Sequence, residues 1–270
     1  MTAPRSLAVI LLVTGVALSG CSASTGRPGD SSRGPRSAGA HFRLFDNTYY
    51  RDSDLSACRT STSYTVYESR VMALTGQTSA KQELALPDRA AYQSMLRRAV
   101  DRGGPVILDF ETLYLKGARH VAERRYDKLK RFLTWTRQVF PNRIVGVYGV
   151  LGNTDPAHRD LAKALAPLQD AFFPTLYTTR SSFTAWRAHL DSVRAEAQRV
   201  DPAKRIYPFI WPQFHAAASP TKALLPRAMW RSEVEAVAQT MDGAVVWSGA
   251  RNAGSSTWAR DTCAVMSTTA

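Results

Sequence analysis

The sequence predicts an α/β fold of the distorted (β/α) TIM-barrel type, with about seven strands in a single domain. Short apolar runs alternate with segments whose apolar residues recur at helical spacing. The part able to fold is about 230 residues long, which suits one such barrel. No Gly-x-Gly-x-x-Gly follows an expected strand, which disfavours a dinucleotide-binding sheet.

The first half of this region contains four expected strands, at 42–45, 64–71, 106–111 and 144–148. Between the second and third, Pro87-Asp88 opens a helix whose apolar positions run from Tyr92 to Val100, and Arg102-Gly-Gly104 ends it. A long amphipathic helix follows the third strand and stops at Pro141. Its inward residues are Leu129, Phe132, Leu133, Val139 and Phe140.

The second half repeats the alternation. Helices at about 156–168, around 183–193 and at 231–241 precede strands at 171–177, 205–211 and 243–247. Barrel active sites lie at the C-terminal ends of the strands, so the residues there form the candidate site. They are Asp109, Glu111, Tyr148, Tyr177, Trp211 and Trp247.

The triplet Asp109-Phe110-Glu111 is the main candidate motif. Side chains alternate along a strand, so the two carboxylates would share one face, with Cα atoms about 6.6 to 6.8 Å apart, while Phe110 packs on the other. In a cleft, their repulsion would raise one pKa and keep a proton available for general acid catalysis. The triplet alone equally fits a solvated strand end or a helix cap.

The aromatic residues at the strand ends suit the apolar faces of sugar rings, and their polar atoms can hydrogen-bond. We therefore expect Tyr148, Trp247 and Trp211 to line a sugar site, although core packing alone would explain Trp211. In the segment Trp211-Pro-Gln-Phe-His215, Gln213 or His215 would add a substrate contact. The same segment also fits a turn with a hydrogen-bonded histidine.

Residues 1–20 have the layout of a secretory signal peptide, with Arg5 followed by the apolar stretch Leu7 to Leu18. Leu18-Ser19-Gly20-Cys21 resembles a bacterial lipobox, which implies cleavage before Cys21 and lipid on its thiol. The expected location is the outer face of the bacterial cell membrane. An ordinary signal peptide remains an alternative, and a membrane helix is disfavoured because a span needs about 20 apolar residues.

Residues 21–40 are rich in Ser, Gly, Pro, Ala and Arg, so we expect a flexible tether there and a folded domain over 41–270. Lipid on Cys21 would leave Cys58 and Cys263 as an even pair in an oxidising compartment. This favours a disulfide between the domain's first loop and its last helix, with two unpaired buried thiols as the alternative.

The net charge of +13 suits an anionic partner, such as anionic lipid, an acidic cell-wall polymer or an acidic polysaccharide. Nucleic acid is not expected, because the exported chain has no recognisable motif for it. The five histidines show neither H-x-H nor H-E-x-x-H spacing, and no G-x-S-x-G occurs. We therefore expect no metal and no other cofactor, and no hydrolase of the serine-elbow type.

The strand-end motifs resemble those of the hyaluronidase family of glycoside hydrolases. The family's D-W-E, Gly-aromatic-Tyr-Gly, Pro-Ser-Ile-Tyr and Val-Leu-Trp-Gly motifs are similar to Asp109-Phe-Glu111, Gly146-Val-Tyr148-Gly149, Pro174-Thr-Leu-Tyr177 and Val245-Val-Trp247-Ser-Gly249. A family disulfide, from the loop after the first strand to the segment after that Trp, falls where Cys58 and Cys263 stand.

The resemblance implies a substrate-assisted retaining mechanism, in which the substrate's N-acetyl group is the nucleophile. Glu111 would protonate the leaving glycosidic oxygen and then activate water. Asp109 and Tyr177 would orient the acetamide, and Tyr148 and Trp247 would wall the pocket.

The chain departs from the family at Phe110, where the family has Trp, and at Leu113, where it has a second Trp. The acid pair is kept, so the expected function is a lipid-anchored extracytoplasmic glycoside hydrolase acting on an N-acetylhexosamine-containing polysaccharide. A bacterial polymer or peptidoglycan fits at least as well as hyaluronan. The alternative is a non-catalytic carbohydrate-binding or envelope lipoprotein on the same barrel. A chitinase-like D-x-x-D-x-D-x-E motif would need Asp at Gly104 and Ile107.

Overall fold

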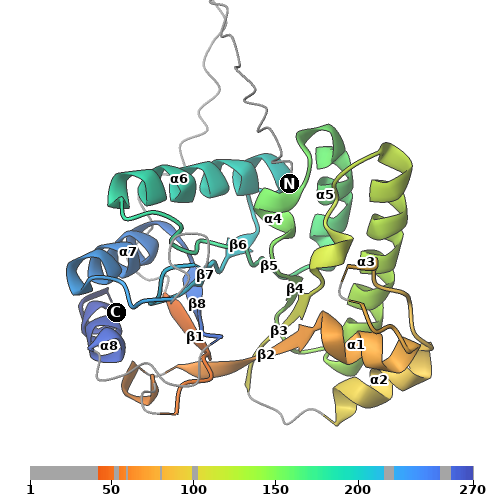
Figure 1. The fold of residues 1–270 in the computed structure, drawn as a ribbon, viewed down its shortest axis with the longest axis horizontal. Coiled ribbons are helices and arrows are strands. Elements are labelled where there is room, and N and C mark those ends of the chain that lie inside the picture. The colour runs from red at the N-terminus through yellow and green to blue at the C-terminus, as the bar shows by residue number, and fades with distance from the viewer. Residues whose placement is uncertain are drawn as a thin grey trace, which may run out of the picture. The chain divides into compact units, whose positions relative to one another are not determined.

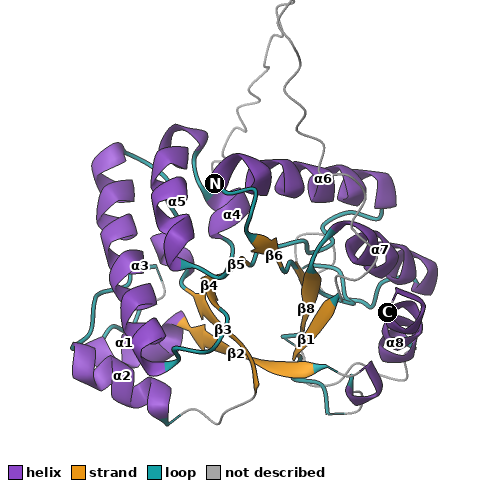
Figure 2. Ribbon diagram, turned by 180° about the vertical axis from the view of Figure 1, so that it is seen from behind, coloured by secondary structure: helices purple, strands orange, loops and turns teal. Residues whose placement is uncertain are grey.

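Parallel strands with buried aliphatic interiors form the centre of the fold, and helices lie around them (Figures 1 and 2). The computed structural model describes residues 42–51, 55–58, 60–79, 81–98, 103–215, 222–249 and 257–269. The expected signal segment 1–20, Cys21 and the tether 21–40 lie outside the described residues, as do Val100 and Arg102. By their contacts, residues 40–270 form one unit.

Six strands form one parallel sheet in the order β4-β3-β2-β1-β8-β7. They are β1 (Arg43–Asn47), β2 (Ser61–Tyr67), β3 (Gly103–Asp109), β4 (Val145–Val147), β7 (Phe209–Ile210) and β8 (Gly243–Trp247). The sheet curls into a half-barrel. The strands β5 (Ala171–Phe172) and β6 (Arg205–Ile206) pair as a second parallel sheet. Isolated bridges from Tyr148 to Phe173 and from Thr175 to Phe209 carry the pairing onward between β4, β5 and β7.

The helices are α1 (Glu68–Thr75), α2 (Arg89–Arg97), α3 (Arg119–Val139), α4 (Val150–Asn153), α5 (Arg159–Leu165), α6 (Phe183–Val200), α7 (Arg227–Thr240) and α8 (Trp258–Thr269). Single 3₁₀ turns occur at η1 (Ser56–Cys58), η2 (Glu111–Leu113), η3 (Pro156–His158) and η4 (Ala166–Leu168). None of the described helices has the length and apolar character that a membrane crossing requires. Helices alternate with the strands along the chain, so the predicted TIM-like α/β fold is confirmed.

The boundaries differ from the prediction in several places, and of the expected strand 171–177 only 171–172 pair regularly, as β5. The expected strand 64–71 is wrong for 68–71. β2 ends at Tyr67, which pairs with Asp109 at the end of β3, and residues 68–71 form the first turn of α1. The expected strand 205–211 is two strands, β6 and β7, separated around Pro208, which has no N–H to donate. The expected helix 156–168 is divided into η3, α5 and η4. The expected helix 231–241 begins earlier, at Arg227.

Alternation along β3 decides which way its end points. Ile107 belongs to an inner apolar cluster with residues such as Phe45, Phe173 and Val245, whereas Val106 and Leu108 pack in the outer cluster against the helices. A side chain two residues beyond Ile107 therefore points into the barrel. That residue is Asp109.

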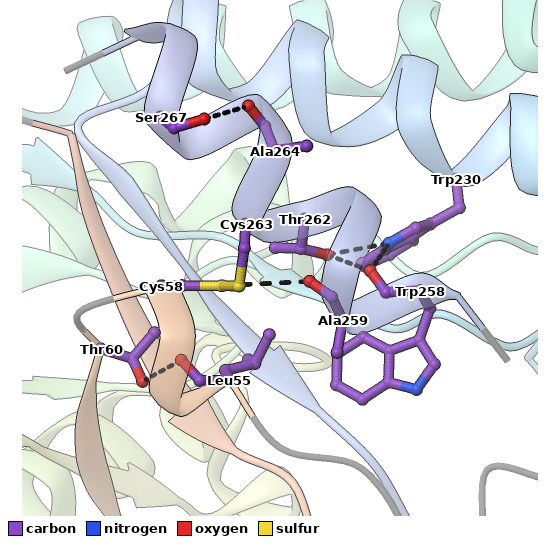
Figure 3. Close-up of a disulfide and its surroundings, with 10 residues drawn as sticks. All are labelled: Leu55, Cys58, Thr60, Trp230, Trp258, Ala259, Thr262, Cys263, Ala264 and Ser267. Atoms are coloured by element: carbon purple, nitrogen blue, oxygen red, sulfur yellow. Dashed lines mark hydrogen bonds between the residues drawn. A yellow bond between two sulfur atoms is a disulfide. The ribbon is translucent and has the colours of Figure 1, made fainter.

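A disulfide joins Cys58 of η1 to Cys263 of α8, 205 residues apart in the sequence (Figure 3). Beside it, the indole N–H of Trp230 in α7 donates to the carbonyl of Trp258 at 3.2 Å and to the hydroxyl of Thr262 at 3.0 Å. The disulfide favoured by the cysteine count is thus present in the structure. It ties the segment between β1 and β2 to the last helix.

Candidate active site

The two carboxyls of the main motif open onto one cavity of about 520 Å³ at the C-terminal ends of the strands. Asp109 is the last residue of β3, and Glu111 is the first residue of η2, so the expected strand 106–111 ends two residues early. Phe110 points the other way, where its fully buried ring meets Phe132 of α3 with centroids 4.8 Å apart. Packing of Phe110 against α3 thereby turns both carboxyls toward the cavity.

The predicted aromatic residues gather around the same cavity. Tyr148, Tyr177, Trp211 and Trp247 all line it, from the ends of β4, β7 and β8 and from the segment after β5. Tyr177 is central, since its ring centroid lies 5.4 Å from that of Trp247, 5.7 Å from that of Trp211 and 6.5 Å from that of Tyr148. The structure therefore brings together Asp109, Glu111 and all four aromatic candidates.

Gln213 is not among the residues that line this cavity. Its amide oxygen accepts from the Trp211 indole at 3.0 Å and from the Tyr50 hydroxyl at 2.7 Å, and its amide N–H donates to the Lys222 carbonyl at 2.6 Å. These contacts use the amide within the protein. Gln213 holds Trp211 in place, and its direct contact with a substrate stays a prediction.

A third carboxyl, Glu68, does not line the cavity but lies close enough for its charge to act on Asp109, and the sequence reasoning missed it. It begins α1 directly after Tyr67, which pairs with Asp109 across β2 and β3. The Thr112 hydroxyl donates to the Glu68 carboxylate and accepts the N–H of Leu84 at 2.9 Å. The signal was its place after a strand, hidden because the expected strand was continued through Glu68-Ser69-Arg70 to Val71.

Tyr114 also lines the cavity and was missed. Its hydroxyl lies against Gly149, where a Cβ would stand only 2.3 Å from the hydroxyl oxygen, and the backbone of Gly149 is left-handed with φ of +70°. Only glycine suits both conditions. The glycine directly after Tyr148 was therefore the available sign that another side chain packs closely against the backbone at this position.

The three carboxyls repel one another. Burial, and then the charges of Glu111 and Glu68, raise the pKa of Asp109 to about 8. Burial also raises the pKa of Glu68, with Glu111 adding to the effect. Within the part of the chain that the structure describes, the buried Oδ1 of Asp109 has no hydrogen-bond partner. The cluster therefore keeps a proton at neutral pH, and that proton resides on Asp109.

Two further groups lie against the aromatic wall of the cavity, which consists of Tyr148, Tyr177, Trp211 and Trp247. The His215 ring stacks on Tyr177, with centroids 5.9 Å apart and an angle of 13°. The Lys222 ammonium lies 5.8 Å from the centre of the Trp211 ring. Among the described residues, Lys222 alone of the non-glycines has a positive φ, 51°, a conformation that strains a side-chain-bearing residue.

Together, the barrel and its strand-end site define a protein with a glycoside-hydrolase-like fold. The chain is similar to bee venom hyaluronidase, with a TM-score of 0.56 and 12% identity over 84% of this chain and 95% of that one. At this identity the likeness shows the shared fold.

Two other structures align too loosely to bear on the fold. One is a β-glucuronidase of Bacteroides uniformis, with a TM-score of 0.44 and 9% identity over 77% of this chain and 26% of that one. The other is a family 5 glycoside hydrolase of Prevotella bryantii, with a TM-score of 0.45 and 8% identity over 84% and 82% of the two chains. No family model matches the sequence, and no curated protein matches it.

Proposed function

We propose that this chain is a glycoside hydrolase that cleaves an N-acetylhexosamine-containing polysaccharide with retention, assisted by the substrate's acetamide. The observation that carries the proposal is the carboxyl pair at the end of β3. Asp109 is half-buried with a raised pKa, and Glu111 is exposed at the same aromatic-lined cavity. A glycosidase needs one carboxyl to move a proton and another group to stabilise positive charge at the sugar.

In the first step, the acetamide carbonyl oxygen attacks the anomeric carbon while the glycosidic C–O bond breaks. Glu111 gives its proton to the leaving oxygen, and the sugar is left as a cyclic oxazolinium ion. In the second step, water attacks the anomeric carbon, Glu111 takes a proton from that water, and the acetamide is restored. The net reaction is hydrolysis of the glycosidic bond, and Glu111 ends protonated as it began.

Asp109 has a specific part in this scheme. Its carboxyl group lines the cavity, and we assign it the hydrogen bond from the N–H of the bound acetamide. A hydrogen bond to a carboxylate favours the ionised form, so binding would release the proton held by Asp109. Glu111 is the neighbouring carboxyl able to take it, and the substrate itself would thus charge the general acid.

The aromatic wall supports a sugar ligand. Tyr177 and Trp247 are the half-buried rings at one end of the cavity, and the buried Trp211 packs edge-on against both of them. The Tyr148 hydroxyl is hydrogen-bonded with Thr175 and Tyr177, which fixes both phenols relative to the carboxyls. The Lys222 ammonium on this wall suits an acidic substituent, in keeping with an anionic polysaccharide.

We place the enzyme outside the cell membrane, held by lipid on Cys21 through residues 21–40, with residues 41–270 as the hydrolase domain. The signal-like segment and the lipobox carry this part of the proposal. Metabolic labelling with radioactive palmitate should mark the wild-type chain and not the Cys21→Ser variant. Equal labelling of both chains would contradict the anchor.

Product release from a panel of polymers tests the activity. Purified residues 41–270 should release reducing ends from at least one of hyaluronan, chitin oligomers and peptidoglycan, and from none of the polymers without N-acetyl groups, such as cellulose. Tight binding without release from any of them would favour the non-catalytic carbohydrate-binding alternative. Release only from the polymers without N-acetyl groups would contradict acetamide assistance.

A further inference from the structure

The segment that follows β5 and carries Tyr177 is held in part by side chains from two helices. The regular pairing of β5 stops at Phe172, and isolated bridges follow at Phe173 and Thr175. Beyond them, the indole N–H of Trp186 in α6 donates to the carbonyl of Leu176 at 2.9 Å. This side-chain contact adds to the backbone hydrogen bond from the Leu176 N–H to the Phe209 carbonyl, which also holds the segment before Tyr177.

Glu233 of α7 supplies the second contact. The Thr178 hydroxyl lies 2.8 and 3.0 Å from the two carboxyl oxygens of Glu233, and both residues are buried. Burial raises the pKa of Glu233 to about 8, so the group is a neutral acid at pH 7, able both to donate to the hydroxyl and to accept from it. Its neighbours on α7, Val234 and Val237, pack in the apolar core.

A carboxyl in such surroundings is unfavourable unless it is hydrogen-bonded, and the described contacts give it Thr178 for this purpose. Thr178 directly follows Tyr177, and its carbonyl accepts the N–H of His215 at 2.8 Å. His215 in turn stacks on Tyr177. The contact between Glu233 and Thr178 therefore fixes both rings of the stacked pair.

We propose that Glu233 is a positioning residue, which holds Thr178 and through it sets the Tyr177 hydroxyl and the His215 ring in the cavity. The effect of Glu233 on the rate of cleavage rests on the proposed function. Its effect on the positions of the Tyr177 and His215 rings does not. Glu233 reaches no cavity-lining position itself, since Thr178 lies between it and the site.

The test compares Glu233→Leu, Thr178→Val and Glu233→Gln in residues 41–270. Glutamine keeps a donor and an acceptor, so it should rescue the contact. Thr136→Val is the matched control, because it removes another buried helix contact, to the Tyr92 hydroxyl at 2.9 Å, between two residues that do not line this cavity. The readouts are the NMR ring-proton shifts of Tyr177 and His215, and kcat and KM on a cleaved polymer.

We expect shifted ring signals and a fall in kcat of roughly 10- to 100-fold, with a smaller change in KM, for Glu233→Leu and Thr178→Val. Glu233→Gln and Thr136→Val should keep wild-type ring signals and kcat within about three-fold. Unchanged ring signals in folded Glu233→Leu and Thr178→Val would overturn the proposal, as would equal losses in Thr136→Val. Should the wild type cleave nothing, the proposed function fails, and the ring signals still decide the role of Glu233.

Discussion

At the scale of single residues, two buried acids oppose the usual effect of pH on stability. The pKa of Asp109, ordinarily 3.8, and that of Glu233, ordinarily 4.5, are both raised by burial to about 8. Between pH 4 and 8 the folded chain thus holds protons that the unfolded chain releases. Their contribution is complete below about pH 4 and is lost as the pH rises to about 8.

Each group should lower the free energy of unfolding by up to about 1.4 kcal/mol per pH unit within this range. Asp109→Asn and Glu233→Gln should therefore each flatten the curve between pH 5 and 8, measured by urea unfolding. Variant curves parallel to the wild-type curve would show that these carboxyls are ionised in the folded protein. Glu83, whose pKa Arg124, Lys128 and Arg125 lower to about 2, acts in the opposite sense at lower pH.

The same carboxyls set the pH dependence of the proposed activity. One proton must remain in the cluster for acid catalysis, and the cluster loses it with an apparent pKa near 8, the value to which burial raises Asp109. We expect kcat/KM to fall by about ten-fold per pH unit above that value. A profile that stays flat to pH 9.5 would contradict proton storage at this site.

At the scale of elements, the turn from β4 into α4 shapes the cavity. Gly149 and Gly152 both have positive φ, but only an added Cβ at Gly149 would meet Tyr114. Gly152→Ala should lower the free energy of unfolding by about 1 to 2 kcal/mol, because alanine is strained in the left-handed backbone conformation. Gly149→Ala should lower the free energy of unfolding by at least about 1 kcal/mol more, because the added Cβ clashes with Tyr114. It should also weaken the binding of a sugar ligand.

Thermal unfolding and isothermal titration with a chitin oligomer would measure both effects. The Gly152→Ala variant is the matched control, because its backbone strain is similar and nothing lies within 4 Å of the added Cβ. Equal stability and equal affinity in the two variants would show that Tyr114 moves aside without consequence. The cavity would then not depend on this contact.

At the scale of the whole molecule, the disulfide spans 205 residues. On the chain-entropy model, closing such a loop stabilises the folded state by about 5 kcal/mol. The double variant Cys58→Ser and Cys263→Ser should therefore unfold at much lower urea concentration and with a similar or larger m-value. An unchanged midpoint would mean that the packing of α8 against α7 alone holds the end of the chain.

The sequence predicted much of this arrangement because a few local rules govern a parallel barrel. Period-two alternation and the position of barrel sites identified Asp109, Tyr148, Tyr177 and Trp247 at strand ends that converge. Glu68 was missed because the expected strand was extended past Tyr67 to Val71, across the polar residues Glu68-Ser69-Arg70 that begin α1. Tertiary contacts, invisible in the local pattern, decide that boundary.

Loop residues were harder to predict for a different reason. Tyr114 and Lys222 reach the cavity through turns whose shape depends on Gly149 and on the Gln213 contact. Gln213, polar and next to a strand end, was an apt candidate, but its amide is taken up by Trp211 and Tyr50. Position along the chain shows which residues approach a site, whereas hydrogen-bond partners decide which of them face it.

The central claim is that Glu111 moves the proton in glycoside cleavage. The most direct measurement is kcat for Glu111→Gln on the polymer that the wild type cleaves best. Glu235→Gln, at an exposed acid of α7 paired with Arg231, serves as control. We predict a fall in kcat of about 10² to 10⁴-fold with oligosaccharide affinity within about three-fold, and no change in the control. A Glu111→Gln chain that folds, binds and turns over like the wild type would contradict the account.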